Sequence, residues 1–126
     1  MIVGTGVDIV EVQRVKRAFE LWGERFLKRV FTQRELDYAD TKKFSHQTLA
    51  ARFACKESVL KAFGDTRVGI RLKNIEILND SKGKPEVVLH GEAKEFAKNN
   101  NLDNIIVSMS HTSDYAISNA ILWKNS

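Results

Sequence analysis

Apolar and polar positions recur at helical spacing in the first half of the chain and alternate in much of the second half. This pattern predicts one strand, then helices, then antiparallel strands. The expected elements, in chain order, are a strand over 2–9, helices over 11–21, 26–31, 32–40 and 45–64, strands over 75–77 and 87–89, a helix over 92–98, and a hairpin over 105–110 and 115–123. We therefore expect an α+β fold, with a single domain over residues 1–126 and helices mostly in the first half.

Residues with capping preferences mark several of the predicted boundaries. Thr32 followed by Glu35 has the form of a capping box, in which the two side chains satisfy backbone groups at the start of a helix. Ser45 is the expected N-cap of the long helix. Gly64 is expected to end that helix, because glycine adopts the backbone conformation that commonly follows the last turn.

The first strand is interpreted as buried. Val3, Val7 and Ile9 are expected on one face of it. Gly4 and Gly6 lack side chains and permit the close approach of another backbone.

The segment 49–64 is unusual because its apolar residues fall on every side of a helix. Such a helix is buried, either in the core or against another subunit. Its charges therefore need an explanation, since unpaired buried charge is costly. Glu57 and Lys61 share one face, while Arg52 and Lys56 lie on a second face.

Two interpretations of these charges stay open on spacing alone. Glu57 and Lys61 are either an ordinary ion pair between residues four apart or part of a functional site. Asp8, after the two glycines, is either a helix N-cap or a second carboxylate for a metal. Mg²⁺ takes one or two protein carboxylates and completes its shell with water and phosphate oxygens. In the functional interpretation the lysines and Arg52 bind phosphate.

Composition favours an acidic partner without choosing one. The chain has 20 Lys+Arg against 16 Asp+Glu, a net charge of +4, and a pI near 9.3. The main alternative function is a non-enzymatic basic nucleic-acid-binding module. It lacks the paired exposed aromatics of a strand that binds single-stranded nucleic acid, and it leaves Asp8 and Glu57 unexplained. A further alternative is a structural oligomer whose charged pairs set subunit register.

A single cysteine, Cys55, excludes an intramolecular disulfide and a cysteine-based zinc cage. The first residues carry no basic leader, and no apolar run approaches the roughly 18 residues that a membrane span requires. A cytoplasmic location is expected.

Four segments resemble, in order, the motifs of the holo-[acyl-carrier-protein] synthase family, the small bacterial 4′-phosphopantetheinyl transferases. They are GTGVDIVEV followed by Arg14, RFACKESVLKAFG from Arg52, GKP from Gly83, and VSMSH from Val107. The resemblance extends from the first residue to about Leu122. Cys55 and Ser58 stand where the family usually has small apolar residues, and neither change removes a charge from the proposed site.

The resemblance implies a magnesium-dependent transfer of 4′-phosphopantetheine from coenzyme A to a serine of apo acyl carrier protein, with release of adenosine 3′,5′-bisphosphate. It implies that Asp8 and Glu57 hold the metal and that these two and Lys61 are catalytic. Our hypothesis for the serine proton is that Glu57 assists its loss, directly or through a metal-bound water. Coenzyme A binding falls to Arg52, Lys61, Gly64 and His111. Without the resemblance, His111 reads as an ordinary residue of a hairpin tip.

The same resemblance implies an acidic carrier protein as partner and a homotrimer with active sites between subunits, without nucleic acid or membrane. The carrier is expected to bind a basic stretch in the first helical region. The residues expected to contact it are Arg14, Arg17 and Arg25.

Overall fold

The computed structural model describes residues 1–64 and 69–125 of the protein, and its elements follow the predicted order. They are β1 (Ile2–Glu11), α1 (Val12–Trp22), α2 (Glu24–Val30), α3 (Gln33–Asp40), α4 (Ser45–Phe63), the 3₁₀ helix η2 (Leu72–Asn74), β2 (Ile75–Asn79), β3 (Pro85–Leu89), α5 (Gly91–Asn99), β4 (Asn104–His111) and β5 (Tyr115–Trp123). The α+β prediction is confirmed.

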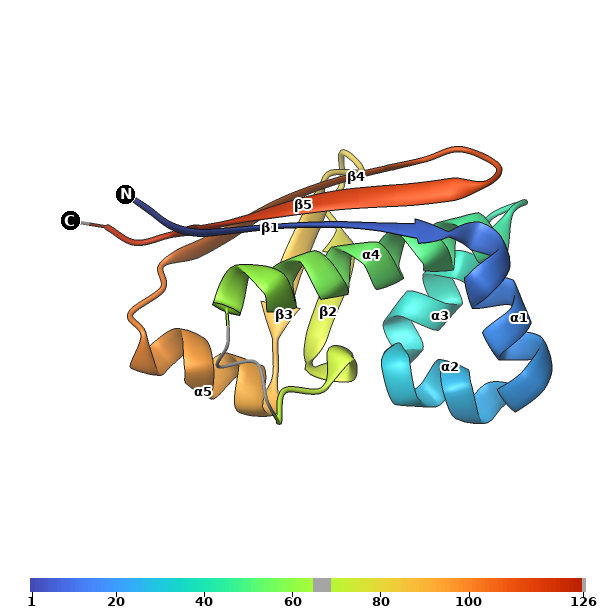
Figure 1. Cartoon of the computed structure of the whole chain (residues 1–126), viewed down its shortest axis with the longest axis horizontal. Coiled ribbons are helices and arrows are strands. Elements are labelled where there is room, and N and C mark those ends of the chain that lie inside the picture. The colour runs from blue at the N-terminus through green and yellow to red at the C-terminus, as the bar shows by residue number, and fades with distance from the viewer. Residues whose placement is uncertain (65–68, 126) are drawn as a thin grey trace.

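The strands form two antiparallel sheets. The first has the order β1-β5-β4, with Asp8 opposite Ser118 and Val107 opposite Ala120; the second is the hairpin of β2 and β3. Figure 1 shows the three-stranded sheet along one side of α4, with α1 to α3 gathered at one end of that helix. Within residues 1–64 and 69–125, none of the helices combines the length and the hydropathy that a membrane span requires.

Helix α4 is the centre of the core, which explains why its sequence is apolar on all sides. Residues 49–54 of α4 pack with α1, α2, α3 and the inner end of β1, while residues 55–63 pack with β2, α5, β4 and β5. Between Leu49 and Phe63 only Phe53, Glu57 and Lys61 escape full burial. Of the two explanations that the pattern allowed, burial within the chain's own core accounts for this helix.

The predicted buried face of β1 is wrong. Val3, Val7 and Ile9 point away from α4 and are 46%, 58% and 62% exposed. The inward face instead carries Gly4 and Gly6, because α4 packs against the strand too closely for larger residues. Apolar residues thus occupy the open face of this sheet.

The capping box is confirmed. The hydroxyl of Thr32 accepts a hydrogen bond from the backbone amide of Glu35. The carboxylate of Glu35 accepts one from the backbone amide of Thr32 at 2.8 Å. The N-cap predicted for α4 is wrong, because Ser45 is already helical and Phe44 occupies the cap position. Gly64 follows the last turn with a φ of +84°, as predicted.

Candidate active site

Strand β1 runs antiparallel along α4, and only glycine fits at their contact. A Cβ atom on Gly6 would lie 2.0 Å from the carbonyl oxygen of Ser58. One on Gly4 would lie 2.6 Å from the carbonyl oxygen of Ala62. A step of two residues along β1 therefore corresponds to about one turn back along α4.

Asp8 is the next inward-facing residue of β1, so the same step places it beside residues 54–58, the turn that carries Glu57. The ammonium group of Lys61 donates to Oδ1 of Asp8 at 2.9 Å. Asp8 does not cap α1, because Glu11 holds that position. The structure thereby excludes the capping interpretation of Asp8 and joins it to the helix that carries the other predicted catalytic residues.

The donor set at this contact suits a hard cation. Glu57 is half-buried on α4, one turn before Lys61 and on the same helix face. The described residues contain no group of three or more His, Cys, Asp or Glu that could hold a metal. A cation here would rely on two carboxylates and on oxygens from outside the chain, which is the arrangement that Mg²⁺ favours.

Lys56 does not belong to this site, contrary to the hypothesis that all the helix cations bind phosphate. Its fully buried ammonium group lies 2.8 Å from Oε1 of Glu35 and donates to the carbonyl oxygens of Leu72 at 3.1 Å and Ile75 at 2.6 Å. Burial lowers the pKa of Lys56, and the charge of Glu35 opposes that effect. With its donors engaged in the core, Lys56 connects α4 to α3, η2 and β2.

Arg52 and His111, far apart in sequence, line one cleft of about 380 Å³. The cleft also includes Gly83 and Pro85 of the Gly-Lys-Pro turn, so three of the four sequence motifs contribute to it. The other lining residues are Tyr38, Lys42, Thr48, Ala51, Asn79 and Met109.

Arg52 is 2% exposed and is oriented by its neighbours. Its guanidinium group lies 4.3 Å from the centre of the Tyr38 ring and donates to Oδ1 of Asn79. Its Nε is buried without a hydrogen-bond partner among the described residues. Burial lowers the pKa of Arg52. An anion in the cleft would satisfy the unpaired donor and offset the cost of burying the charge.

The sequence interpretation missed three residues of this cleft. Lys42 places its ammonium group 4.8 Å from the centre of the Tyr38 ring, and Asn79 accepts a hydrogen bond from Arg52. Tyr38 and Lys42 precede α4, and Asn79 ends β2. Only tertiary packing brings them together, so no local spacing could have identified them.

Gly64 and Cys55 are the remaining residues of the α4 motif that the sequence singled out. Gly64 is exposed at the end of α4, on the same side of the helix as Glu57. Cys55 is fully buried, and burial raises the pKa of its thiol to about 11. Such a thiol stays protonated at neutral pH, which agrees with a packing role.

The predicted carrier-binding residues are all exposed. Arg14 and Arg17 are three positions apart on α1 and share a helix face, while Arg25 lies on α2. None of the three forms an ion pair with a carboxylate of the described residues.

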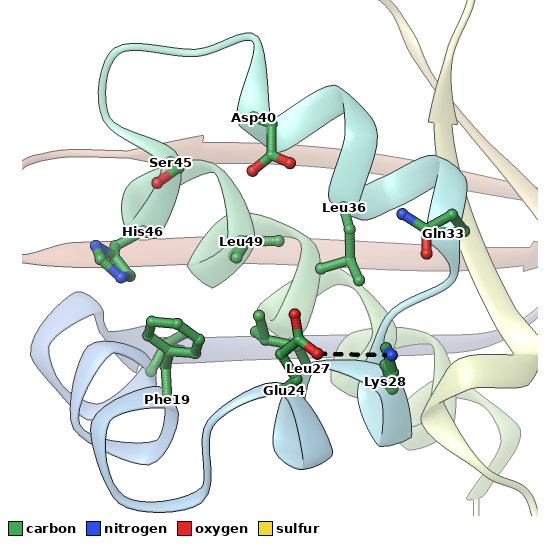
Figure 2. Close-up of a pocket in the computed structure, with 11 residues that line it drawn as sticks. Phe19, Glu24, Leu27, Lys28, Gln33, Leu36, Asp40, Ser45, His46 and Leu49 are labelled. Carbon is green, nitrogen blue, oxygen red and sulfur yellow. Dashed lines mark ion pairs between the residues drawn. The ribbon is translucent and has the colours of Figure 1, made fainter.

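A separate cavity of about 310 Å³ lies between α1, α2, α3 and the start of α4 (Figure 2). Leu27, Leu36 and Leu49 give it an apolar interior. The ion pair of Glu24 and Lys28, 3.6 Å long, lies at its side. Within the described part of the chain, the residues that line it include none of the predicted catalytic or cofactor-binding residues.

Comparison with known proteins agrees with the motifs. A sequence model of the 4′-phosphopantetheinyl transferase superfamily matches residues 4–120. The holo-[acyl-carrier-protein] synthase of Solibacter usitatus is 42% identical over 97% of this chain and 98% of its own length. The crystal structure of the Neisseria meningitidis holo-[acyl-carrier-protein] synthase has a TM-score of 0.90 at 31% identity, covering 98% of this chain and 100% of that one. The Helicobacter pylori synthase, in complex with coenzyme A, has a TM-score of 0.81 at 27% identity, covering 94% and 99%. The chain therefore belongs to the holo-[acyl-carrier-protein] synthases, a family of transferase enzymes within the 4′-phosphopantetheinyl transferase superfamily.

Proposed function

We propose that the protein transfers 4′-phosphopantetheine from coenzyme A to a serine of apo acyl carrier protein. The serine oxygen forms a bond to the phosphorus next to pantetheine, and the bond from that phosphorus to the bridging pyrophosphate oxygen breaks. Adenosine 3′,5′-bisphosphate leaves with the bond electrons. The observation that carries this proposal is the contact of Lys61 with Asp8 at 2.9 Å, on the helix face of Glu57, in a chain of this family.

The catalytic roles follow from the charges at the β1–α4 contact. Mg²⁺ held by Asp8 and Glu57 would neutralise charge on the pyrophosphate when bound. Lys61 is close enough to add a further positive charge there. Glu57, directly or through a water, is the acceptor for the serine proton, which then passes to solvent.

The cleft of Arg52 and His111 is the proposed site for the 3′-phosphate and adenine end of coenzyme A. The Helicobacter pylori relative binds coenzyme A, and the unpaired Nε of Arg52 offers a buried donor to an anion. Gly64 lies past Lys61 on the same side of α4. Because it has no side chain, it would let the cofactor approach the backbone closely.

We propose that acyl carrier protein binds through Arg14, Arg17 and Arg25, whose positive charges are exposed and uncompensated among the described residues.

A homotrimer with active sites between subunits is also proposed. Helix α4 does not support a trimer, because the chain's own core buries it. The support comes from the open face of the sheet, where Val7, Ile9 and other apolar side chains are exposed. A single domain over 1–126 and a cytoplasmic location complete the proposal.

Mass spectrometry of apo acyl carrier protein tests the reaction. After incubation with the protein, coenzyme A and Mg²⁺, we expect the carrier to gain the mass of one phosphopantetheine group. Parallel samples without coenzyme A or with a chelator in place of Mg²⁺ should show no gain. A carrier that stays unmodified in the complete mixture contradicts the proposed reaction, and full modification in the presence of chelator contradicts its magnesium dependence.

A further inference from the structure

Glu35 on α3 and Lys56 on α4 form an ion pair inside the core that the proposed reaction does not use. The ammonium group of Lys56 lies 2.8 Å from Oε1 of Glu35, and both side chains are 0% exposed. Such a pair adds little net stability, because the cost of removing two charges from water offsets their attraction. An apolar pair would fill the same volume, so the ion pair is better explained by the geometry that it fixes.

The carboxylate of Glu35 joins three elements. Its Oε1 faces the ammonium group of Lys56 on α4, and it accepts a hydrogen bond at 2.8 Å from the backbone amide of Thr32, at the start of its own helix. Its Oε2 accepts a hydrogen bond from the backbone amide of Ile77 on β2 at 2.9 Å. Hydrogen bonds to a charged group are strong and directional. Glu35 therefore fixes α3, α4 and β2 relative to one another.

One turn away, the same two helices make a second contact in the cleft that Arg52 lines. Tyr38 follows Glu35 by three positions and shares its face of α3, while Arg52 precedes Lys56 by four positions and shares its face of α4. The guanidinium group of Arg52 lies 4.3 Å from the centre of the Tyr38 ring. The buried ion pair thus sets the spacing of the helices where Tyr38 supports Arg52.

The other partner of Arg52 comes from the strand that Glu35 holds. Asn79 is two residues beyond Ile77 on β2, so the two side chains lie on the same face of the strand. The side-chain oxygen of Asn79 accepts a hydrogen bond from the guanidinium group of Arg52. Both contacts that orient Arg52 therefore come from elements that the carboxylate of Glu35 fixes.

We infer that Glu35, paired with Lys56, is a positioning residue that holds the guanidinium group of Arg52 ready for the 3′-phosphate of coenzyme A. The inference rests on the proposed function, which places that phosphate in the Arg52 cleft. The described residues that line this cleft do not include Glu35, so Glu35 acts through Tyr38 and Asn79. An arginine that is already oriented loses less conformational freedom when its ligand binds, and this increases affinity.

Steady-state kinetics of Glu35→Gln test the inference, because this substitution keeps the size of the side chain and removes its charge. We expect the KM for coenzyme A to rise about tenfold, the effect of one weakened hydrogen bond to a charged group. The KM for dephospho-coenzyme A, which lacks the 3′-phosphate, should change little, and so should kcat. In an Arg52→Met background, Glu35→Gln should leave the KM for coenzyme A unchanged, because the residue through which Glu35 acts is absent.

The matched control is Glu76→Gln, the same change at a second buried carboxylate. Glu76 also bonds to the start of α3, and its hydrogen bonds within the described chain come from Thr32, Arg34 and His90. We expect this variant to lose stability while its ratio of the KM values for coenzyme A and dephospho-coenzyme A stays normal. The control thus separates a loss of stability from a loss of positioning.

A second variant keeps the test decisive if Glu35→Gln does not fold, since that change leaves the ammonium group of Lys56 buried without its counter-charge. The double variant Glu35→Gln with Lys56→Met removes both charges and should unfold at nearly the temperature of the unaltered protein. It should still show the raised KM for coenzyme A, because α4 is no longer bonded to α3 and β2 at this point. Normal stability together with a normal KM for coenzyme A would overturn the inference.

The remaining outcomes separate the inference from the proposed function. Equal changes in the KM values for coenzyme A and dephospho-coenzyme A, in a variant with a native circular dichroism spectrum, would show that Glu35 does not position Arg52 and would leave the function standing. If the unaltered protein does not modify the carrier, the function fails, and the inference fails with it.

Discussion

Asp8 and Lys61 meet because two glycines let the backbone of β1 rest on α4, and Glu57 occupies the adjoining turn of the same helix. We expect Asp8→Asn and Glu57→Gln each to lower kcat about 100-fold or more, because each removes a charge that the pyrophosphate site requires. The concentration of Mg²⁺ for half-maximal transfer should rise in both variants. Carrier modification, measured against Mg²⁺ concentration, gives both quantities.

Glu11→Gln is the matched control for these variants, because it neutralises an exposed carboxylate on the same strand. It should retain normal transfer. Circular dichroism should show native spectra for all three proteins. Near-normal turnover by either site variant would contradict the assignment of that residue.

His111 is expected to distinguish coenzyme A from dephospho-coenzyme A, which lacks the 3′-phosphate. If His111 binds that phosphate beside Arg52 in the shared cleft, His111→Ala should raise the KM for coenzyme A about tenfold, the cost of one good hydrogen bond. The KM for dephospho-coenzyme A should change little. The control is His46→Ala, which removes an imidazole that lines the separate cavity. Equal changes for both substrates would place His111 elsewhere.

Single residues also show the limits of inference from sequence. The charges of α4 were identified correctly as unusual, but spacing could not tell a core charge from a site charge. Lys56 and Lys61 differ by five positions on one helix, yet the first is fully buried against Glu35 and the second is half exposed beside Asp8. The difference lies in what packs on each face, and that depends on residues distant in sequence.

At the scale of elements, the Glu76 carboxylate on β2 joins α3 to the start of α5. Burial alone would raise its pKa, but hydrogen bonds from Thr32, His90 and Arg34 outweigh burial and lower the pKa to about 2. This value is below the 4.5 of an unperturbed glutamate. The resulting stabilisation is therefore complete above pH 4.5 and is lost as the pH falls from 4.5 towards 2.

We expect Glu76→Gln to lower the free energy of unfolding at pH 7 by about 2 kcal/mol, because charge-assisted hydrogen bonds become neutral ones. The variant should also lose less stability than the unaltered protein between pH 4.5 and pH 3. Urea unfolding at pH 7, 4.5 and 3 measures both effects. Glu86→Gln, at an exposed position of β3, is the control and should follow the unaltered protein. Parallel pH profiles for Glu76→Gln and the unaltered protein would contradict the role of Glu76.

Elements with local signals were predictable, except that Phe44 and not Ser45 is the N-cap of α4. The buried side of a strand was not predictable. The capping box at Thr32 and the glycine after α4 both depend on neighbours in sequence, and both were predicted. The alternation of faces along β1 was also predicted correctly. The error was to assign its apolar face, with Val7 and Ile9, to the core, whereas that face is exposed. Hydrophobicity could not reveal that Gly4 and Gly6 mark the inner face, because their role depends on the closeness of α4.

At the scale of the whole molecule, the face of the β1-β5-β4 sheet opposite α4 exposes Val7, Ile9 and Ile117 at 58%, 62% and 45%. If a homotrimer buries this face, sedimentation of the unaltered protein should give a molecular mass of about three times the chain mass of 14.3 kDa. Ile117→Lys should shift the protein to monomer and reduce transfer, since charge is costly in an apolar interface. Leu21→Lys, an equally apolar exposed site on α1, should leave the assembly intact. Sedimentation velocity with a parallel transfer assay decides the question, because a fully active monomer at micromolar concentration would exclude active sites that need two subunits.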